Sequence, residues 1–180
     1  MPGAVFISIE EMQGPMNFTD LYDRYFGKVY NYVRYHVRVP DEADDVTGRI
    51  FEAALRSYSA YDGAKGPVQA WLFTIARNAV IDWARTRNHR AEVPLEAAGD
   101  RDGGEPHPAA ALERKEEAGL LLAAVGTLDE RSRDIIALKF SSGLNNREIA
   151  QMTGLGESNV GILVYRAVKK MQTFIEGRKL

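Results

Sequence analysis

The residues with the clearest chemical potential form an acidic run directly after Pro40. The run contains Asp41, Glu42, Asp44 and Asp45. Carboxylates bind Mg²⁺, so this run with His36 or His89 could serve a metal-dependent phosphodiesterase. However, the acids have the positions of first-turn residues on a helix, where the helix dipole favours them, and we expect Asp41 to be its N-cap.

Other signals of metal or phosphate chemistry are absent from the sequence. No histidine pair has metal-ligand spacing, and no glycine-rich phosphate loop occurs. We therefore expect no metal, no cofactor and no enzymatic activity. The acidic run is then a solvated face by default, or an acidic docking surface for a basic partner.

A second polar group lies along the apolar segment that begins at Val68. One flank of that segment carries Asn78, Asp82 and Arg85 at i, i+4 and i+7, with Trp71 above them. The preceding loop adds Tyr58 and Tyr61. Bases stack on aromatic rings while basic groups hold phosphates, so this strip suits single-stranded DNA. The alternative is a core tryptophan beside a solvent-facing rim.

The stretch from Leu144 to Met171 has the spacing of a helix-turn-helix. Ile149 and Ala150 supply an apolar and a small residue where two helices cross, and Gly154 stands where the turn needs a positive φ. Such a unit lays its second helix, here from Glu157, in the major groove of DNA. An ordinary helical hairpin is the alternative.

The elements that must position these groups are helices. No strand alternation occurs, and the 180 residues are 45% hydrophobic with no cysteine. We predict an all-α chain of two small helical domains joined by a flexible acidic linker, the second domain a helix-turn-helix. The expected divisions are an N-terminal extension at 1–15, a first domain at 16–90, a linker at 91–116 and a second domain at 117–180.

The expected location is the cytoplasm. The first residues lack a basic start and carry Glu10 and Glu11 after a short apolar run, unlike a secretory signal. No apolar run is long enough to span a bilayer, so we expect no membrane insertion.

In order, these pieces resemble a bacterial RNA polymerase sigma factor of the extracytoplasmic-function (ECF, group IV) type of the sigma-70 family. The likeness covers roughly residues 18–171. Its most specific stretch is WLFTIARNAVIDWAR, from Trp71 to Arg85; the others are FTDLYDRYFGKVYNYV, DEADDVTGRIFEAAL and LDERSRDIIALKFSSGLNNREIAQMTGL.

The resemblance implies partners and a role for each site. The first domain would bind core RNA polymerase, at the beta-prime clamp helices, through Asp41, Asp44, Asp45, Val46 and Phe51; the beta subunit is expected as a further partner. It would recognise the melted minus-ten element of promoter DNA through Tyr58, Tyr61, Lys65, Trp71, Arg77, Asn78, Asp82 and Arg85. The second domain would bind the minus-35 element through Arg147, Ser158, Asn159, Tyr165, Arg166 and Lys169.

The sequence departs from the family in two places. The recognition helix has Val160-Gly161-Ile162-Leu163-Val164 where the family commonly has a Val-Lys-Ser-Arg-Leu type run, so its two basic residues are absent. Gly48-Arg49 stands where the family often has Gln-Glu. Arginine to guanine is the commonest specific major-groove contact, and this part of the helix lacks it. We hypothesise that Ile162 and Leu163 form an exposed apolar patch that binds an inhibitory anti-sigma factor. The rival function is a helix-turn-helix regulator that does not engage polymerase.

Overall fold

The structure is a computed structural model that describes residues 16–88 and 108–178. Predictions for residues 1–15, for His89 and for residues 91–107 lie outside the described part. Within it the chain forms only helices, in the order α1 (Phe18–His36), α2 (Pro40–Ser57), α3 (Val68–Asn88), α4 (Pro108–Gly126), α5 (Glu130–Ala137), α6 (Asn146–Thr153) and α7 (Glu157–Glu176). The all-α prediction is confirmed.

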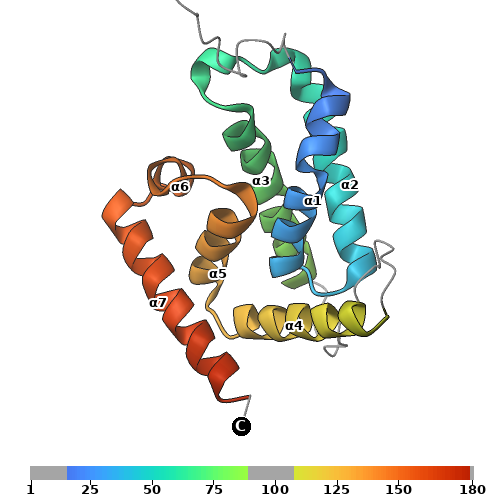
Figure 1. The fold of residues 1–180 in the computed structure, drawn as a ribbon. Helices are drawn as coiled ribbons and strands as arrows, with labels where there is room; N and C mark the ends of the chain where they lie inside the picture. Colours follow the sequence, from blue (N-terminus) through green and yellow to red (C-terminus); the bar gives the residue numbers. More distant parts are fainter. Residues whose placement is uncertain (1–15, 89–107, 179–180) are drawn as a thin grey trace, which may run out of the picture.

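Helices α1, α2 and α3 form the first bundle (Figure 1). The buried positions of α2 include Ala43, Val46, Ile50 and Ala54, a spacing of three and four residues that gives one apolar face. The predicted N-cap at Asp41 is wrong, because the cap position is Val39 and Asp41 lies in the first turn. Pro40 occupies the first helical position, where its missing N–H leaves one fewer donor to cap.

Helices α4 to α7 form the second bundle. Its α4 begins at Pro108, inside the range that the sequence assigned to the linker. Asp129 caps α5, since its side chain accepts a hydrogen bond from the Ser132 N–H at 2.9 Å. After α5 the chain makes a π-helical turn at Leu138–Ser142, which ends at Gly143 with a φ of 79°.

The helix-turn-helix comprises α6 and α7. Asn145 and Glu148 form a capping box at the start of α6. Gly154 ends α6 with a φ of 73°, which confirms the predicted left-handed turn. Ile149 and Val160 are fully buried and close the corner between the two helices.

The two bundles pack against each other rather than standing apart. One continuous core contains Leu21 and Val33 of α1, Leu72 of α3, Leu138 after α5 and Ile149 of α6. A smaller core joins α4, α5 and α7 through Ala124, Leu128, Ile136, Ala167 and Met171. In Figure 1, α5 lies between α7 and the first bundle, and α4 crosses below them. Among the described helices, none is long and apolar enough to cross a membrane.

Candidate nucleic-acid and polymerase surfaces

The polar strip predicted on α3 is open to solvent. Asn78, Asp82 and Arg85 are all exposed, one above the other on the helix. Arg85 and Asp82 form an ion pair of 3.6 Å between exposed groups, which contributes little to stability. Both side chains can therefore exchange this contact for a ligand at small cost. We define Trp71, Asn78, Asp82 and Arg85 as the α3 strip.

A cluster of aromatic rings adjoins the α3 strip at its N-terminal end. The ring of Trp71 lies 5.3 Å from that of Tyr61 and 6.0 Å from that of Tyr58. The Tyr61 hydroxyl donates to the Gly66 carbonyl at 2.8 Å, which anchors the loop to its own backbone. Burial and the neighbouring Tyr58 raise the Tyr61 pKa, so the hydroxyl stays protonated. Trp71 and Tyr61 are half-buried, so each ring keeps accessible surface for a stacked base.

Lys65 lies beyond these rings in the same loop. Asp62 accepts a hydrogen bond from the Ala64 N–H and shapes the turn that presents Lys65. The Lys65 ammonium is 3.9 Å from the Asp62 carboxylate, and 83% of its side chain is exposed. The structure thus brings the loop residues predicted for single-stranded DNA onto the same side of the bundle as the aromatic rings.

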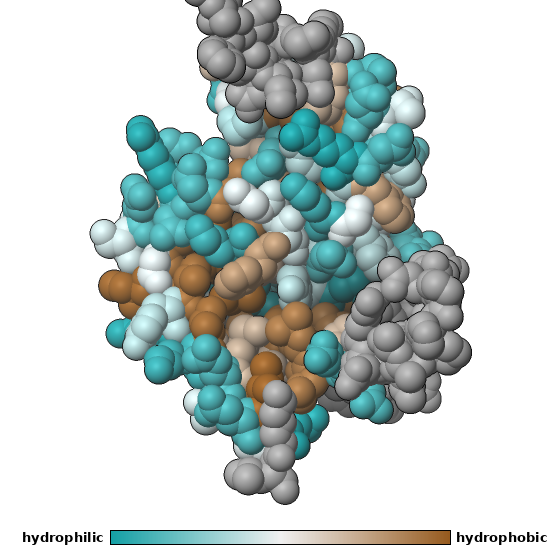
Figure 2. Space-filling model, viewed as in Figure 1, coloured by the Kyte–Doolittle hydropathy of each residue, from teal (hydrophilic) through white to brown (hydrophobic). Residues whose placement is uncertain are grey.

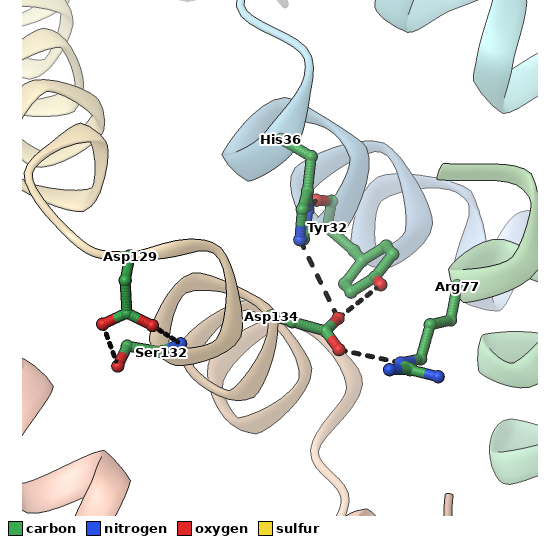
Figure 3. A network of polar contacts seen from close by, with 6 residues as sticks. All are labelled: Tyr32, His36, Arg77, Asp129, Ser132 and Asp134. Carbon is green, nitrogen blue, oxygen red and sulfur yellow. Dashed lines mark hydrogen bonds and ion pairs between the residues drawn. The ribbon is translucent and has the colours of Figure 1, made fainter. Parts of the chain in front are cut away.

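Arg77, predicted to contact DNA, is engaged with the second bundle instead. Its Nε donates to Asp134 Oδ2 of α5 at 2.7 Å. The Tyr32 hydroxyl donates to Asp134 Oδ1 at 2.9 Å, and His36 Nε2 lies 3.8 Å from the same oxygen. Figure 3 shows Asp134 between α1 and α3, with these groups around its carboxylate. We call Tyr32, His36, Arg77 and Asp134 the Asp134 network.

Burial sets the protonation states in the Asp134 network. It raises the pKa of Tyr32 well above its usual value, and the adjacent Asp134 charge adds to this, so the hydroxyl remains a donor. Burial also lowers the pKa of His36, more strongly than the Asp134 carboxylate raises it. His36 is therefore neutral at pH 7. Its Nδ1 donates to the Tyr32 carbonyl at 3.1 Å, because a carbonyl can only accept.

The residues of α2 that were expected to contact the polymerase differ in their exposure. Asp41 and Asp45 are exposed and Asp44 is half-buried. Val46 and Phe51 were also expected to contact the polymerase, but they are only 2% and 5% exposed and belong to the core. Their spacing places them on the apolar side of α2, toward α1.

Exposed apolar groups lie over Phe51. Its ring contacts those of Tyr22 at 4.8 Å and Phe26 at 5.8 Å, which are 40% and 38% exposed. Leu55 on α2 is 56% exposed. This face therefore combines exposed acids with an aromatic rim, and Phe51 supports that rim from below.

The predicted recognition helix presents its polar residues to solvent. Ser158, Asn159, Tyr165, Arg166 and Lys169 of α7 are exposed, and so is Arg147 of α6. Their spacing along α7 places them on one side, opposite the buried Val160 and Ala167. The side that would meet a DNA groove is therefore free of intramolecular packing across the described residues.

The apolar patch predicted on α7 is smaller than expected. Ile162 is 49% exposed, but Leu163 is half-buried and packs against the shared core. Tyr165, three residues after Ile162 and on the same side, is 64% exposed and replaces Leu163 as its exposed neighbour. Figure 2 shows hydrophobic residues gathered on the face that carries α7 and α4.

Sequence reasoning missed the pairing of Tyr32, His36 and Asp134. The one available signal was on α1, where Tyr32 and His36 lie about one turn apart and on the same side of the helix as Tyr25 and Val29. His36 faces Asp134 of α5 rather than the acids of α2. Among residues 16–88 and 108–178, no group of three histidines or acids could hold a metal ion.

Two family models match the chain in the order of its two bundles. Sigma-70 region 2 matches residues 21–90, and Sigma-70 region 4 matches residues 118–171. The α3 strip and the acidic face fall in the first match, and the helix-turn-helix falls in the second.

Curated relatives match across both regions. The ECF RNA polymerase sigma factor BldN of Streptomyces coelicolor is 33% identical over 154 residues, which are 86% of this chain and 58% of BldN. This chain therefore spans less than two thirds of that relative. SigM of Bacillus subtilis, an ECF sigma factor, is 25% identical over 87% of this chain and 94% of its own. The sigma factor CnrH of Cupriavidus metallidurans is 30% identical over 75% of this chain and 74% of its own.

Solved structures share the arrangement of helices. The sigma factor RpoE in complex with the anti-sigma factor NepR from Bartonella quintana has a TM-score of 0.71 at 18% identity, over 88% of this chain and 96% of that one. CnrH in complex with the cytosolic domain of CnrY has a TM-score of 0.62 at 26% identity, over 89% of this chain and 88% of that one. The first likeness concerns the fold alone.

Proposed function

This chain belongs to the sigma-70 family as an ECF sigma factor, and from that premise we propose that it is a group IV factor that binds core RNA polymerase in the cytoplasm and directs it to promoters. The observation that carries the proposal is the presence of regions 2 and 4, in order, on a fold that leaves the DNA-facing sides of α3 and α7 exposed. The chain acts by binding rather than by catalysing a reaction of its own.

Region 2 opens and reads the minus-ten element in this proposal. An unpaired base can be flipped out and read on the hydrogen-bonding edge that duplex DNA hides. Asn78 and Asp82 supply the donor and acceptor groups for such an edge. Trp71 and Tyr61 supply rings for stacking, and Arg85 supplies a cation for the phosphates.

Region 4 holds the duplex minus-35 element through α7. Asn159 near the start of α7 has an amide that can pair with the N6 and N7 atoms of adenine. Arg166 and Lys169, about two to three turns further on, are placed for phosphates, which position the helix without specifying sequence. The absence of basic residues at Gly161 and Leu163 leaves this helix with fewer groups for direct base contacts than the family pattern has.

Core polymerase binds the acidic, aromatic face of α2 and α1. Asp41 and Asp45 give this face its negative charge, and Tyr22 and Phe26 give it exposed ring area. Charged groups steer association, while partly buried rings supply most of the binding energy at protein interfaces. The partner surface is the clamp helices of the beta-prime subunit, and region 4 approaches the beta subunit.

An anti-sigma factor is the proposed inhibitor. Support comes from the solved structure of the sigma factor CnrH, which is 26% identical to this chain and is in complex with the cytosolic domain of CnrY. On this chain, Ile162 and Tyr165 present an exposed apolar surface on the helix that would otherwise enter DNA. A protein that covers this surface excludes DNA from α7.

Run-off transcription with purified core polymerase and a random promoter library tests the proposal. The chain should select promoters that share a minus-ten element, and Asn78→Ala or Arg85→Ala should abolish that selection. Arg178→Ala, which removes an exposed arginine outside both DNA-facing sides, is the matched control. Promoter binding without polymerase-dependent initiation would instead identify a regulator that does not engage polymerase.

A further inference from the structure

A short ion pair between the two regions uses a residue that the family resemblance assigns to DNA. Arg77 donates to Asp134 at 2.7 Å, and the two side chains are only 27% and 16% exposed. A charge-assisted bond of this kind, shielded from water, is stronger than an exposed ion pair. The fully buried Tyr32 hydroxyl holds the other carboxylate oxygen and fixes its direction.

The Asp134 carboxylate offers Arg77 the same chemistry as a DNA phosphate. Both are anions whose oxygens accept from the N–H groups of arginine, and Asp134 presents Oδ2 to Arg77 while Tyr32 holds Oδ1. Asn78, next to Arg77, is exposed on the α3 strip, so Arg77 lies at the border between that strip and the surface that region 4 covers. A carboxylate from region 4 and a phosphate from DNA therefore compete for one guanidinium.

In the packed arrangement the two regions lie too close together to bind both promoter elements at once. The two promoter elements lie ~25 base pairs apart, which is on the order of 85 Å at 3.4 Å per base pair. A compact chain of this length is only about 40 Å across. A cleft of about 1180 Å³ between the two regions is lined by residues of both α3 and α6, so these helices are close neighbours. Regions 2 and 4 must separate before both elements are bound.

We propose that Asp134 acts as an internal substitute for a DNA phosphate, which occupies Arg77 and holds regions 2 and 4 in a closed state that cannot bind a promoter. Separation of the regions breaks the Arg77–Asp134 contact and frees the guanidinium for the melted strand. Because the DNA phosphate binds Arg77 only in the open state, DNA shifts the equilibrium toward opening. The role of Arg77 in DNA binding rests on the proposed function, whereas the closing contact itself does not.

Single-molecule energy transfer on the whole chain measures the closed state directly. The chain has no cysteine, so cysteines placed at the exposed Glu52 of α2 and Gln172 of α7 can carry the two dyes. Asp134→Asn keeps the shape of the side chain but removes its charge, and should raise the ratio of open to closed molecules about tenfold. Glu116→Gln, which removes an exposed acid from α4, should leave the ratio unchanged.

A double-mutant cycle separates the contact from general damage to region 4. Arg77→Gln should open the chain by itself without altering α5, and adding Asp134→Asn to it should have little further effect. Circular dichroism reports whether each variant keeps its helices. If Arg77→Gln and Asp134→Asn both leave the closed population unchanged, or if their effects simply add, the proposal is wrong.

Binding of a fluorescent single-stranded oligonucleotide pool tests the competition with phosphate. Asp134→Asn should bind the pool several times more tightly than the unmodified chain, and the gain should vanish when Arg77→Gln is also present. An equal gain in both backgrounds would contradict the phosphate substitution. If Asp134→Asn opens the chain but no variant binds DNA, the closing contact stands and the DNA role of Arg77 is refuted. Failure of the closing contact and failure of the proposed function are therefore distinguishable.

Discussion

Two glycines of the helix-turn-helix should respond to alanine with opposite signs. Gly154 has a φ of 73°, a left-handed conformation that costs an L-residue about 1–2 kcal/mol. A Cβ added there meets nothing within 4 Å, so backbone strain is the whole effect. Gly154→Ala should therefore lower the free energy of unfolding by about 1–2 kcal/mol.

Gly161 provides the opposite case on the neighbouring helix. It lies within α7, where alanine is favoured over glycine by about 1 kcal/mol. A Cβ at this position would lie 3.5 Å from the Asn146 amide nitrogen, an ordinary contact that needs no adjustment. Gly161→Ala should therefore raise the free energy of unfolding by up to about 1 kcal/mol.

Urea and thermal unfolding of the two variants measure this difference. For a chain of this length, 1 kcal/mol moves the midpoint of thermal unfolding by about 2–4 °C. Gly154→Ala should melt below the unmodified protein and Gly161→Ala above it. If both variants moved the midpoint in the same direction, the assignment of one backbone conformation to the turn and another to α7 would be refuted.

Three further predictions concern the cap, a buried histidine and the tryptophan of the α3 strip. Asn145→Ala removes the oxygen that accepts from the Glu148 N–H at 2.9 Å, and should cost about 1 kcal/mol of unfolding free energy by urea titration, with the exposed Ser158→Ala as control. Folding lowers the pKa of His36, so as the pH falls the unfolded chain binds the His36 proton before the folded chain does. The contribution of His36 to the free energy of unfolding should therefore be complete above about pH 6.5, the unfolded pKa. It should fall as the pH drops from there through the lower folded pKa. His36→Gln should flatten that slope, and an unchanged slope would contradict the assignment. The groups that act on the His36 pKa are Tyr32, Asp134, Arg133 and Glu130. Trp71→Ala should weaken binding to a premelted minus-ten template by about 1–3 kcal/mol while duplex minus-35 binding stays unchanged, measured by fluorescence anisotropy.

Local signals predicted the helix ends well, with one instructive exception. Gly154 ends α6 as expected, and Asp129 and Gly143 lie at helix ends for the same reason, because each satisfies a backbone requirement within a few residues of itself. Asp41 does not cap α2, because the helix already begins at Pro40 and Asp41 lies within its first turn. Caps compete locally, so neighbouring residues decide between them.

The contact between the two regions could not be read from periodicity. An apolar stripe shows that a helix face is buried, but it does not identify the surface that covers it. On α1 the side that carries Val29 and Tyr32 is buried, and only the structure shows that α5 packs against this helix. The Arg77–Asp134 pair joins residues 57 positions apart, and no local pattern marks such a pair.

Exposure within the predicted sites was also beyond the sequence. Val46 and Leu163 share residue types with true surface contacts, but their helix faces turn toward a core. By contrast, the α3 strip has its predicted exposure, because its polar residues lie opposite the buried Leu72, Ala76 and Val80. Sites carried on one strongly patterned helix are therefore the most predictable.

The central claim is that this chain gives core RNA polymerase its promoter specificity. Transcription from a random promoter library, with purified core polymerase and the chain as the two protein components, measures this directly. The account predicts initiation from a defined minus-ten sequence that depends on the chain and is lost in Asn78→Ala and Arg85→Ala. Initiation that is equally strong without the chain, or unchanged in both variants, would contradict it.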